Sequence, residues 1–218
     1  MSMRTLVLLA AALAVPAGAA RARSDITLSL RAGGGVPYGR TASAAALSDE
    51  LRFALPITAE LTFGVSPRLS VGPFLQYAPG ALSSSAPLGS GACADTGSRC
   101  EDARVLRAGA QLFWLFDGSG RVTTWGAVGT AYEALSYSAR DPSGSGTVTY
   151  RGWEWLNVQL GADVVRLGRG RLGPYASASI GRFERVQVKS EGGSLDGEIA
   201  SETLHGWLQL GIRATLDL

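Results

Sequence analysis

The end of the chain, from Thr203 to Leu218, alternates between apolar and polar side chains along almost its whole length. This period of two is typical of a β-strand with one apolar face. An ordinary strand has roughly five or six residues, so this one needs an apolar neighbour of unusual length, and lipid is the simplest candidate. Only Gly206 interrupts the apolar parity, which otherwise holds Leu204, Leu208, Leu210, Ile212, Ala214, Leu216 and Leu218.

The N-terminus has the layout of a secretory signal peptide. Arg4 precedes an apolar run from Thr5 to Val15, and small residues follow. They offer two cleavage points, after Ala19 or after Ala22, so we expect a signal peptide over residues 1–22 and one mature domain over residues 23–218. A transmembrane anchor would need roughly 20 apolar residues, which is more than this run contains.

The rest of the chain contains no segment apolar enough to span a bilayer as a helix, so a membrane protein of this sequence must be a barrel. The formal net charge is only +2 at pH 7. No basic cluster with interleaved aromatic residues is present, so we expect no nucleic-acid partner.

Two cysteines, Cys93 and Cys100, lie inside a segment rich in glycine and serine, from Pro79 to Asp102. Behind an export signal, such a pair predicts a disulfide that closes a small loop, with free thiols as the alternative. A metal site would need more ligands than these cysteines and the distant His205. We therefore expect no metal and no cofactor.

Seven earlier stretches resemble the C-terminal one and predict seven more strands. Pro56 lies within the second of them and lacks an amide donor, so we expect a bulge or a break in the pairing there. The expected ranges are Ile26–Gly33, Phe53–Val65, Leu69–Tyr77, Leu106–Phe116, Arg121–Tyr137, Trp155–Val164 and Leu172–Lys189.

The expected connections alternate between short and long. Three are tight turns, near Ser66, Asp117 and Gly168. Four are longer loops, over Val36–Arg52, Pro79–Asp102, Arg140–Thr147 and Ser190–Ser201. Short turns at one end and long loops at the other are typical of outer-membrane barrels. The sequence therefore predicts an all-β fold, an eight-stranded antiparallel up-and-down transmembrane β-barrel, with both termini on the short-turn, periplasmic side.

Aromatic residues gather near both expected membrane surfaces, as the interfaces of such barrels select. Phe63, Trp114 and Phe116 lie toward the short turns. The second group, toward the long loops, consists of Phe53, Tyr77, Tyr132, Tyr137 and Trp153.

The whole mature chain resembles the small eight-stranded outer-membrane β-barrels, the group that contains the OmpA transmembrane domain and the OmpX-like and OmpW-like proteins. The resemblance rests on the signal peptide, the eight amphipathic strands and the last strand, Gln209–Leu218. That end is similar to the signal read by the barrel-assembly machinery, although Leu218 stands where the family usually has an aromatic residue. The resemblance implies a place in the cell outer membrane, among outer-membrane lipid and lipopolysaccharide.

The polar parity of the strands carries charges that we expect to point into the barrel. An eight-stranded barrel is just wide enough for its own side chains, so charges there must be paired. Of the set, Arg107 and Glu133 should face each other across one hairpin, and the others should lie toward the periplasmic half. The predicted charge network is Arg31, Glu60, Arg107, Glu133, Asp163 and Arg213.

Motifs for catalysis are weak. The glycines from Gly168 to Gly173 match a dinucleotide-binding pattern, but Pro174 and an alternating strand follow where that chemistry needs a helix. His205 is followed by Gly206 and Trp207, so the His and Ser pair of lipid A deacylases of this shape is absent. We expect no catalytic residue, and we interpret the acidic residues of the last loop as a solvated cluster rather than a calcium site.

We therefore expect a non-enzymatic outer-membrane barrel with a structural or surface-interaction role through four extracellular loops. One alternative is an OmpW-like barrel that binds or passes small hydrophobic molecules. Two others are a soluble lipocalin-like carrier and a lipid-modifying enzyme. The aromatic residues on the inward parity favour the first alternative: Phe74, Phe113, Trp155 and Trp207.

Overall fold

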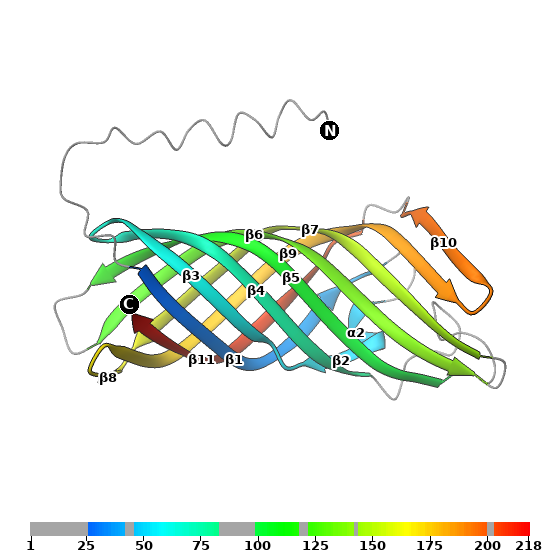
Figure 1. The fold of residues 1–218 in the computed structure, drawn as a ribbon, viewed down its shortest axis with the longest axis horizontal. Helices are drawn as coiled ribbons and strands as arrows, with labels where there is room; N and C mark the ends of the chain where they lie inside the picture. Colours follow the sequence, from blue (N-terminus) through cyan, green and yellow to red (C-terminus); the bar gives the residue numbers. More distant parts are fainter. Residues whose placement is uncertain (1–25, 42–45, 83–98, 118–121, 142–143, 200–202) are drawn as a thin grey trace, which may run out of the picture.

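The computed structural model describes residues 26–41, 46–82, 99–117, 122–141, 144–199 and 203–218. The expected signal peptide over residues 1–22 and the side chains of Cys93 and Cys100 lie outside the described part. The described residues form a single antiparallel sheet that closes on itself as a barrel (Figure 1). In the described part of the chain, no helix is both long enough and apolar enough to cross a bilayer.

The strands are longer than the alternation alone indicates. One helical turn, α2 (Leu47–Glu50), lies between the first two of them. The strands are β1 (Ile26–Gly39), β2 (Leu51–Ala54), β3 (Ile57–Ser66), β4 (Leu69–Leu82), β5 (Arg99–Asp117), β6 (Thr123–Asp141), β7 (Gly144–Asp163), β8 (Val165–Leu167), β9 (Gly170–Ser190), β10 (Gly193–Glu198) and β11 (His205–Asp217).

These segments occupy eight positions around the ring, which confirms the predicted fold. β2 and β3 share one position, and β8 continues β7 against β9. β10 pairs with the outer part of β9, beyond the point where β11 leaves it. The ring closes between the first and last strands, which pair from Thr27 and Asp217 to Gly39 and His205.

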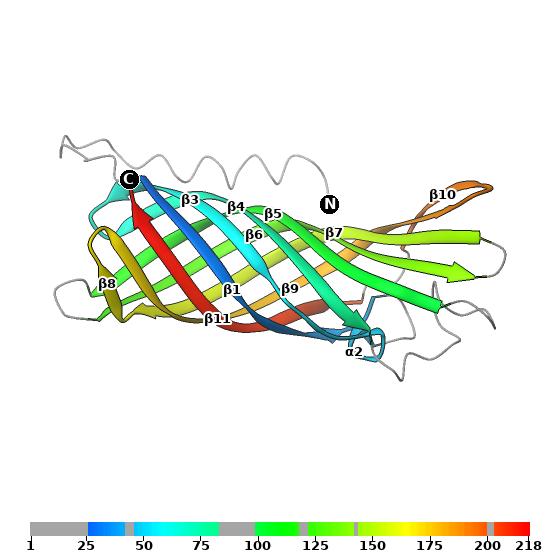
Figure 2. The same cartoon turned by 60° about the horizontal axis from the view of Figure 1, so that its bottom comes forward.

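Two tight turns, the start of β1 and the end of β11 lie at one end of the molecule (Figure 2). Pro67 and Arg68 form the turn between β3 and β4, and Gly168 and Arg169 form the turn between β8 and β9. The Leu218 amide donates to the Ile26 carbonyl over 2.9 Å, so the chain end is tied to the start of β1.

At the opposite end, several expected loops are strand instead. β1 continues to Gly39, past the expected loop start at Val36, because β11 offers a partner at every position up to His205. β6 reaches Asp141 and β7 begins at Gly144, so the expected loop over Arg140–Thr147 is largely a hairpin extension. The small and hydroxylated residues of this stretch end the apolar alternation without preventing the backbones from pairing.

The acidic segment after Lys189 also differs from the expected loop. It forms a hairpin in which β10 pairs with β9 from Gly193 opposite Ser190 to Glu198 opposite Arg185. This hairpin extends past the rim, at the end opposite the C-terminus (Figure 1).

The break predicted at Pro56 is confirmed, because Leu55 and Pro56 separate β2 from β3. The Leu55 amide donates instead to the Pro79 carbonyl over 2.9 Å. The proline therefore interrupts the strand at a point where the neighbouring backbone donors still find acceptors.

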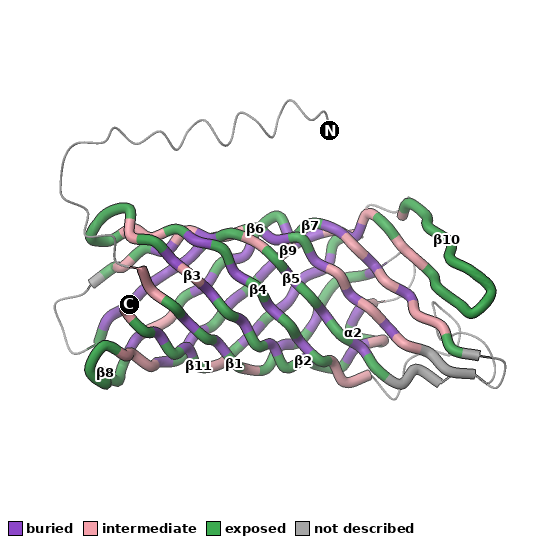
Figure 3. Tube along the Cα trace, viewed as in Figure 1, coloured by how far each residue is buried: buried purple, intermediate pink, exposed green. Residues whose placement is uncertain are grey.

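The wall has an apolar outside and a polar inside, and burial alternates along each strand (Figure 3). On β11, Leu210 is 70% exposed and Gln209 is 6% exposed. The same contrast separates Leu160 from Gln159 on β7. A continuous band of exposed aliphatic side chains is unusual for a protein surface in water.

One bulge changes the facing of β7. Its register against β9 shifts between Glu154 and Leu156, which leaves Trp155 as the extra residue. Trp155 is 48% exposed, so the prediction that it points inward is wrong. Tyr137 is the reverse case, since it is buried and does not belong to the outer aromatic group.

Candidate functional site: the polar interior

The lower level of the interior, toward the tight turns, is built around one carboxylate. Glu60 on β3 receives the guanidinium of Arg31 on one side, and the Nε of Arg213 lies 3.4 Å from it on the other. Arg31 also donates to the side chain of Gln159 on β7. Arg213 donates to the Ser29 hydroxyl over 2.9 Å. The two arginines thus share one buried carboxylate and spread their remaining donors over polar neighbours.

Arg213 also reaches the far wall. Its guanidinium carbon lies 4.7 Å from the ring centre of Phe113 on β5 and 4.5 Å from that of Trp125 on β6. β5 and β11 are opposite each other in the ring. A cation held between two aromatic faces in this way is stabilised by their quadrupoles, and this contact spans the barrel.

Asp163 pairs outside this group. Arg171 on β9 lies 3.6 Å from Asp163 and 2.6 Å from Asp217. Asp163 is buried, whereas Asp217 is part of the barrel end. This bridge ties β7, β9 and β11 together just inside the tight-turn end.

The upper level is centred on Arg107 of β5. Its guanidinium lies 3.2 Å from Glu133 and 3.4 Å from Glu154, and it donates to Gln76 over 3.1 Å. Asn157 donates to Glu154 over 3.0 Å. One guanidinium therefore serves two buried carboxylates, and amide side chains add further hydrogen bonds around them.

Two aromatic side chains of β11 complete this level. Trp207 donates its indole N–H to Glu133 over 3.0 Å, and its ring lies 5.0 Å from the Arg107 guanidinium carbon. His205 Nε2 lies 3.5 Å from Glu133, and its ring stacks on Phe183 at 3.8 Å. His205 is thus a buried partner of the charge cluster.

Above the upper level, an apolar cluster fills the loop-side mouth. Leu47 of α2 and Leu51 of β2 are fully buried within it. Other members come from most of the wall: Ala54, Ala78, Ala103, Val105, Leu135, Tyr137, Val148, Tyr150, Phe183 and Trp207. α2, between β1 and β2, therefore lies over the mouth and helps to cover it.

Glu50, at the end of α2, lies at the edge of this cluster. Burial raises the pKa of the Glu50 carboxyl, and the adjacent Asp49 adds to the shift, whereas the Tyr137 hydroxyl opposes it. The covering segment thus contains a carboxyl that prefers its neutral form more than an ordinary glutamate does.

All six side chains of the predicted charge network are buried: Arg31, Glu60, Arg107, Glu133, Asp163 and Arg213. They lie at two levels, and Arg107 is directly opposite Glu133 in the β5–β6 ladder. Asp163 contacts Arg171 rather than the predicted set. Of the aromatic residues expected inside, the buried ones are Phe74, Phe113 and Trp207.

Glu154 and Arg171 are the members that sequence reasoning missed. Glu154 changes facing because of the bulge at Trp155, and the only sequence signal is the pair of large apolar residues, Trp155 and Leu156, in succession. Arg171 lies directly after a turn. The apolar alternation starts only after it, so the sequence does not show whether its side chain points inward or outward. Within the described ranges, no three His, Cys, Asp or Glu side chains are grouped as metal ligands would be.

Comparison with known proteins finds no matching family model and no matching curated protein. Among solved structures, the chain is similar to a major outer membrane protein from Thermus thermophilus, with 14% identity and a TM-score of 0.58, over 88% of this chain and 99% of that one. OprG from Pseudomonas aeruginosa matches at 10% identity and a TM-score of 0.49, over 89% and 98% of the two chains. Neisserial surface protein A matches at 11% identity and a TM-score of 0.48, over 88% and 97%.

At these identities the likeness concerns the fold. The closed ring of eight positions, the polar filling and the apolar outer wall agree with it. The protein therefore has the fold of the small eight-stranded outer-membrane β-barrels.

Proposed function

We propose that this protein is a non-enzymatic outer-membrane β-barrel with a closed interior, serving a structural or surface-interaction role through its four loop-side connections. The observation that carries the proposal is a pair of contacts across the full width of the barrel. Arg213 reaches Phe113, and Trp207 reaches Arg107, each between β11 and β5. Because an eight-stranded barrel is just wide enough for its side chains, two such contacts obstruct an aqueous path.

The outer-membrane location is supported by the apolar wall and by the aromatic residues at its edges. Trp114 and Phe116 are exposed near the tight turns, and Tyr77 and Tyr132 are exposed toward the loops. Aromatic girdles flanking an apolar band are a property of membrane barrels. Export through the expected signal peptide would leave both termini in the periplasm.

Two kinds of partner follow from the proposal. Outer-membrane lipid and lipopolysaccharide would surround the apolar wall. The barrel-assembly machinery would read β11, whose exposed face holds Leu208, Leu210 and Ile212. No reaction is proposed, because His205 is engaged with Glu133 and Phe183 inside the barrel.

The test combines location and conductance. We expect the protein to fractionate with outer membranes and to migrate differently on a gel before and after boiling. In planar bilayers, the wild type should give no large steady conductance, and Glu60→Ala should raise the frequency of openings by freeing Arg31 and Arg213. A large steady conductance from the wild type would overturn the closed-interior proposal.

A second candidate, the passage of small hydrophobic molecules, is favoured by the apolar mouth. Leu47 and Leu51 fill the centre of that cluster, as an apolar ligand would. If the barrel takes up such molecules, replacing both leucines by alanine should increase uptake of a small alkane or aromatic probe into liposomes. Equal uptake with and without the protein would remove this candidate.

A further inference from the structure

On the outer face of β7, the exposed side chains change from aliphatic to aromatic toward the loop side. Exposed Leu160, Val158 and Leu156 are followed by the exposed tryptophans Trp155 and Trp153. The guanidinium carbon of Arg182, on β9, lies 5.8 Å from the ring centre of Trp155. An apolar band that ends in an aromatic girdle marks the boundary between hydrocarbon and headgroups in membrane barrels.

Two arginines stand directly above this girdle. Arg151 is two residues from Trp153 in a part of β7 that pairs regularly with β6, so it faces outward as Trp153 does. On β9, the extra residue Glu184 brings Arg185 directly opposite Arg151. Directly opposite side chains lie on the same face, and like charges there are destabilising.

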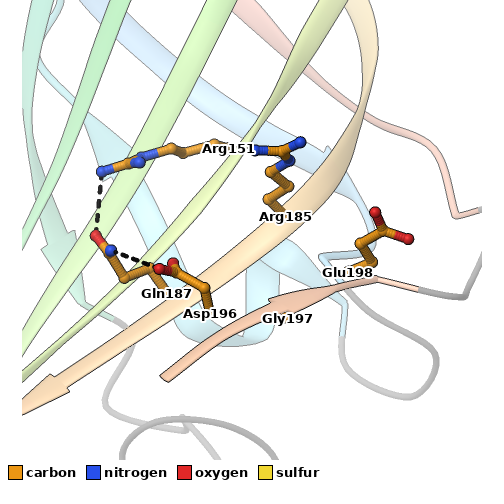
Figure 4. A pocket seen from close by; sticks show the side chains of 6 residues that line it. All are labelled: Arg151, Arg185, Gln187, Asp196, Gly197 and Glu198. Atoms are coloured by element: carbon orange, nitrogen blue, oxygen red, sulfur yellow. Dashed lines mark hydrogen bonds between the residues drawn. The ribbon is translucent and has the colours of Figure 1, made fainter. Parts of the chain in front are cut away.

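Neither arginine is neutralised by the described protein residues. Arg151 donates to the amide oxygen of Gln187 over 3.2 Å, and the same amide donates to Asp196 over 3.3 Å (Figure 4). Within the described ranges, no carboxylate lies in ion-pair distance of Arg151 or Arg185. Glu198 is opposite Arg185 in the β9–β10 ladder, yet it forms no ion pair with it.

These side chains line a pocket of about 280 Å³ on the outer wall, formed by β7, β9 and β10 (Figure 4). Arg151 and Arg185 come from β7 and β9, whereas Asp196 and Glu198 come from β10. The guanidinium of Arg151 extends toward Gln187 and away from that of Arg185 (Figure 4). A guanidinium offers a planar fork of donors that matches phosphate oxygens. An anion in this pocket would therefore bind at the guanidinium groups, while Asp196 and Glu198 would repel it from the β10 hairpin.

We infer that Arg151 and Arg185 bind a phosphate group of an outer-leaflet lipid headgroup; this inference rests on the membrane location proposed above. The phosphate accepts hydrogen bonds from the two guanidinium groups at the level where headgroups begin. Gln187 accepts from Arg151 and donates to Asp196, so its amide separates the guanidinium from that carboxylate. The lipid chain then lies along the apolar face below Trp153 and Trp155.

The test uses lipid A as the probe, added to the folded full-length mature protein in detergent and followed by native mass spectrometry. The double variant Arg151→Gln, Arg185→Gln should bind lipid A about tenfold or more weakly, because hydrogen bonds between charged partners are the strong ones. The control is Arg68→Gln, Arg169→Gln, which removes the same charge from exposed turns at the other end and should leave binding within about twofold of wild type, since neither residue lies near the pocket.

Three further measurements test whether binding requires phosphate and whether that phosphate belongs to a lipid. Dephosphorylated lipid A should bind wild type and double variant equally weakly, and Glu198→Gln should bind lipid A at least as tightly as wild type. Inorganic phosphate at millimolar concentration should not displace lipid A; displacement would assign the site to free phosphate and overturn the lipid assignment.

Other outcomes would also contradict the inference. Unchanged binding by the double variant, unchanged binding of dephosphorylated lipid A by wild type, or weaker binding by Glu198→Gln would each overturn it. If the proposed outer-membrane location is wrong, the wild type will not fractionate with outer membranes, so this result is distinguishable from a failure of lipid binding.

Discussion

The indole N–H of Trp207 donates to Glu133 over 3.0 Å, while Glu133 itself is bound to a neighbouring strand through Arg107. One carboxylate therefore joins the wall formed by β5 and β6 to β11, which lies across the barrel. The interior depends on a few acceptors that each satisfy several donors. Removing such an acceptor leaves more than one buried partner without its counterpart.

Glu133→Ala should accordingly lower the free energy of unfolding by about 3 to 5 kcal/mol, the usual cost of breaking a buried ion pair. Glu133→Gln should cost less, because an amide oxygen still accepts from Trp207. The control Glu191→Ala, in an exposed turn, should stay within about 0.5 kcal/mol of wild type. Urea unfolding in lipid vesicles, followed by tryptophan fluorescence, gives these values. Equal losses for Glu133→Ala and Glu191→Ala would mean that the interior charges are separately solvated.

Leu210→Arg tests the outer face. Leu210 is 70% exposed on the wall, and arginine near the middle of a bilayer should cost roughly 2 to 4 kcal/mol. Leu216→Arg, near the end of β11, should cost only about 0 to 1 kcal/mol. The same unfolding measurement applies, and a position-independent cost would show that β11 does not cross a lipid layer.

Gly206→Val tests the one interruption in the apolar parity of β11. Tyr38 crosses this glycine to donate its hydroxyl to the Ser179 carbonyl, and a Cβ at position 206 would overlap both that carbonyl oxygen and the tyrosine ring. Such overpacking typically costs about 1 to 3 kcal/mol. Gly34→Ala is the control, because its added methyl meets nothing within 4 Å. In the double variant with Tyr38→Ala, most of the penalty of valine should remain, because the backbone carbonyl of Ser179 is the atom nearest to the added Cβ.

The docking of α2 should depend on pH through Glu50. Because burial raises the pKa of this carboxyl, the folded protein holds the proton more tightly than the unfolded chain. Docking is therefore most stable below the ordinary pKa of glutamate and weakens as pH rises through the raised value. Hydrogen exchange over residues 46–51 at several pH values, corrected for the intrinsic exchange rate, measures this trend, and Glu50→Gln should flatten it. An increase of protection with pH would contradict the assignment.

The disulfide between Cys93 and Cys100 stays a prediction. Closing so small a ring constrains the unfolded chain by about 2 to 3 kcal/mol, so the barrel should assemble without it. Mass spectrometry after alkylation of the unreduced protein should find no free thiol. Failure of the Cys93→Ser, Cys100→Ser variant to assemble would require a larger role for this segment.

The sequence predicts the wall better than the rim. From Phe53 to Val65 the alternation is complete, and lipid on one side forces it, so strand and facing follow directly. Between Gly33 and Gly39 no apolar pattern survives, yet β11 extends the ladder there. Backbone pairing with a strand far along the chain does not require any local alternation of apolar residues, so the sequence does not predict it.

The sequence predicts which side chains face the interior only where apolar and polar residues alternate without a break. Arg31, Glu60 and Arg213 lie on regular strands, and their facing follows from counting. Their choice of partners does not, because it depends on which walls meet across the barrel. Arg107 contacts Glu154 as well as Glu133, and Glu154 faces the interior only because of the bulge at Trp155.

The extra residue at Trp155 has a consequence for how β7 tolerates change. Glu154 and Leu156, on either side of it, already pair with adjacent residues of β9, Gly181 and Ile180. Deleting Trp155 would therefore turn the bulge into a regular ladder, with Glu154 still inside and Trp153 still outside. Deleting a residue from a regular part of β7 would instead reverse the faces of everything on one side of the gap. The bulge is thus the one described place where β7 can lose a residue without exchanging its polar and apolar faces.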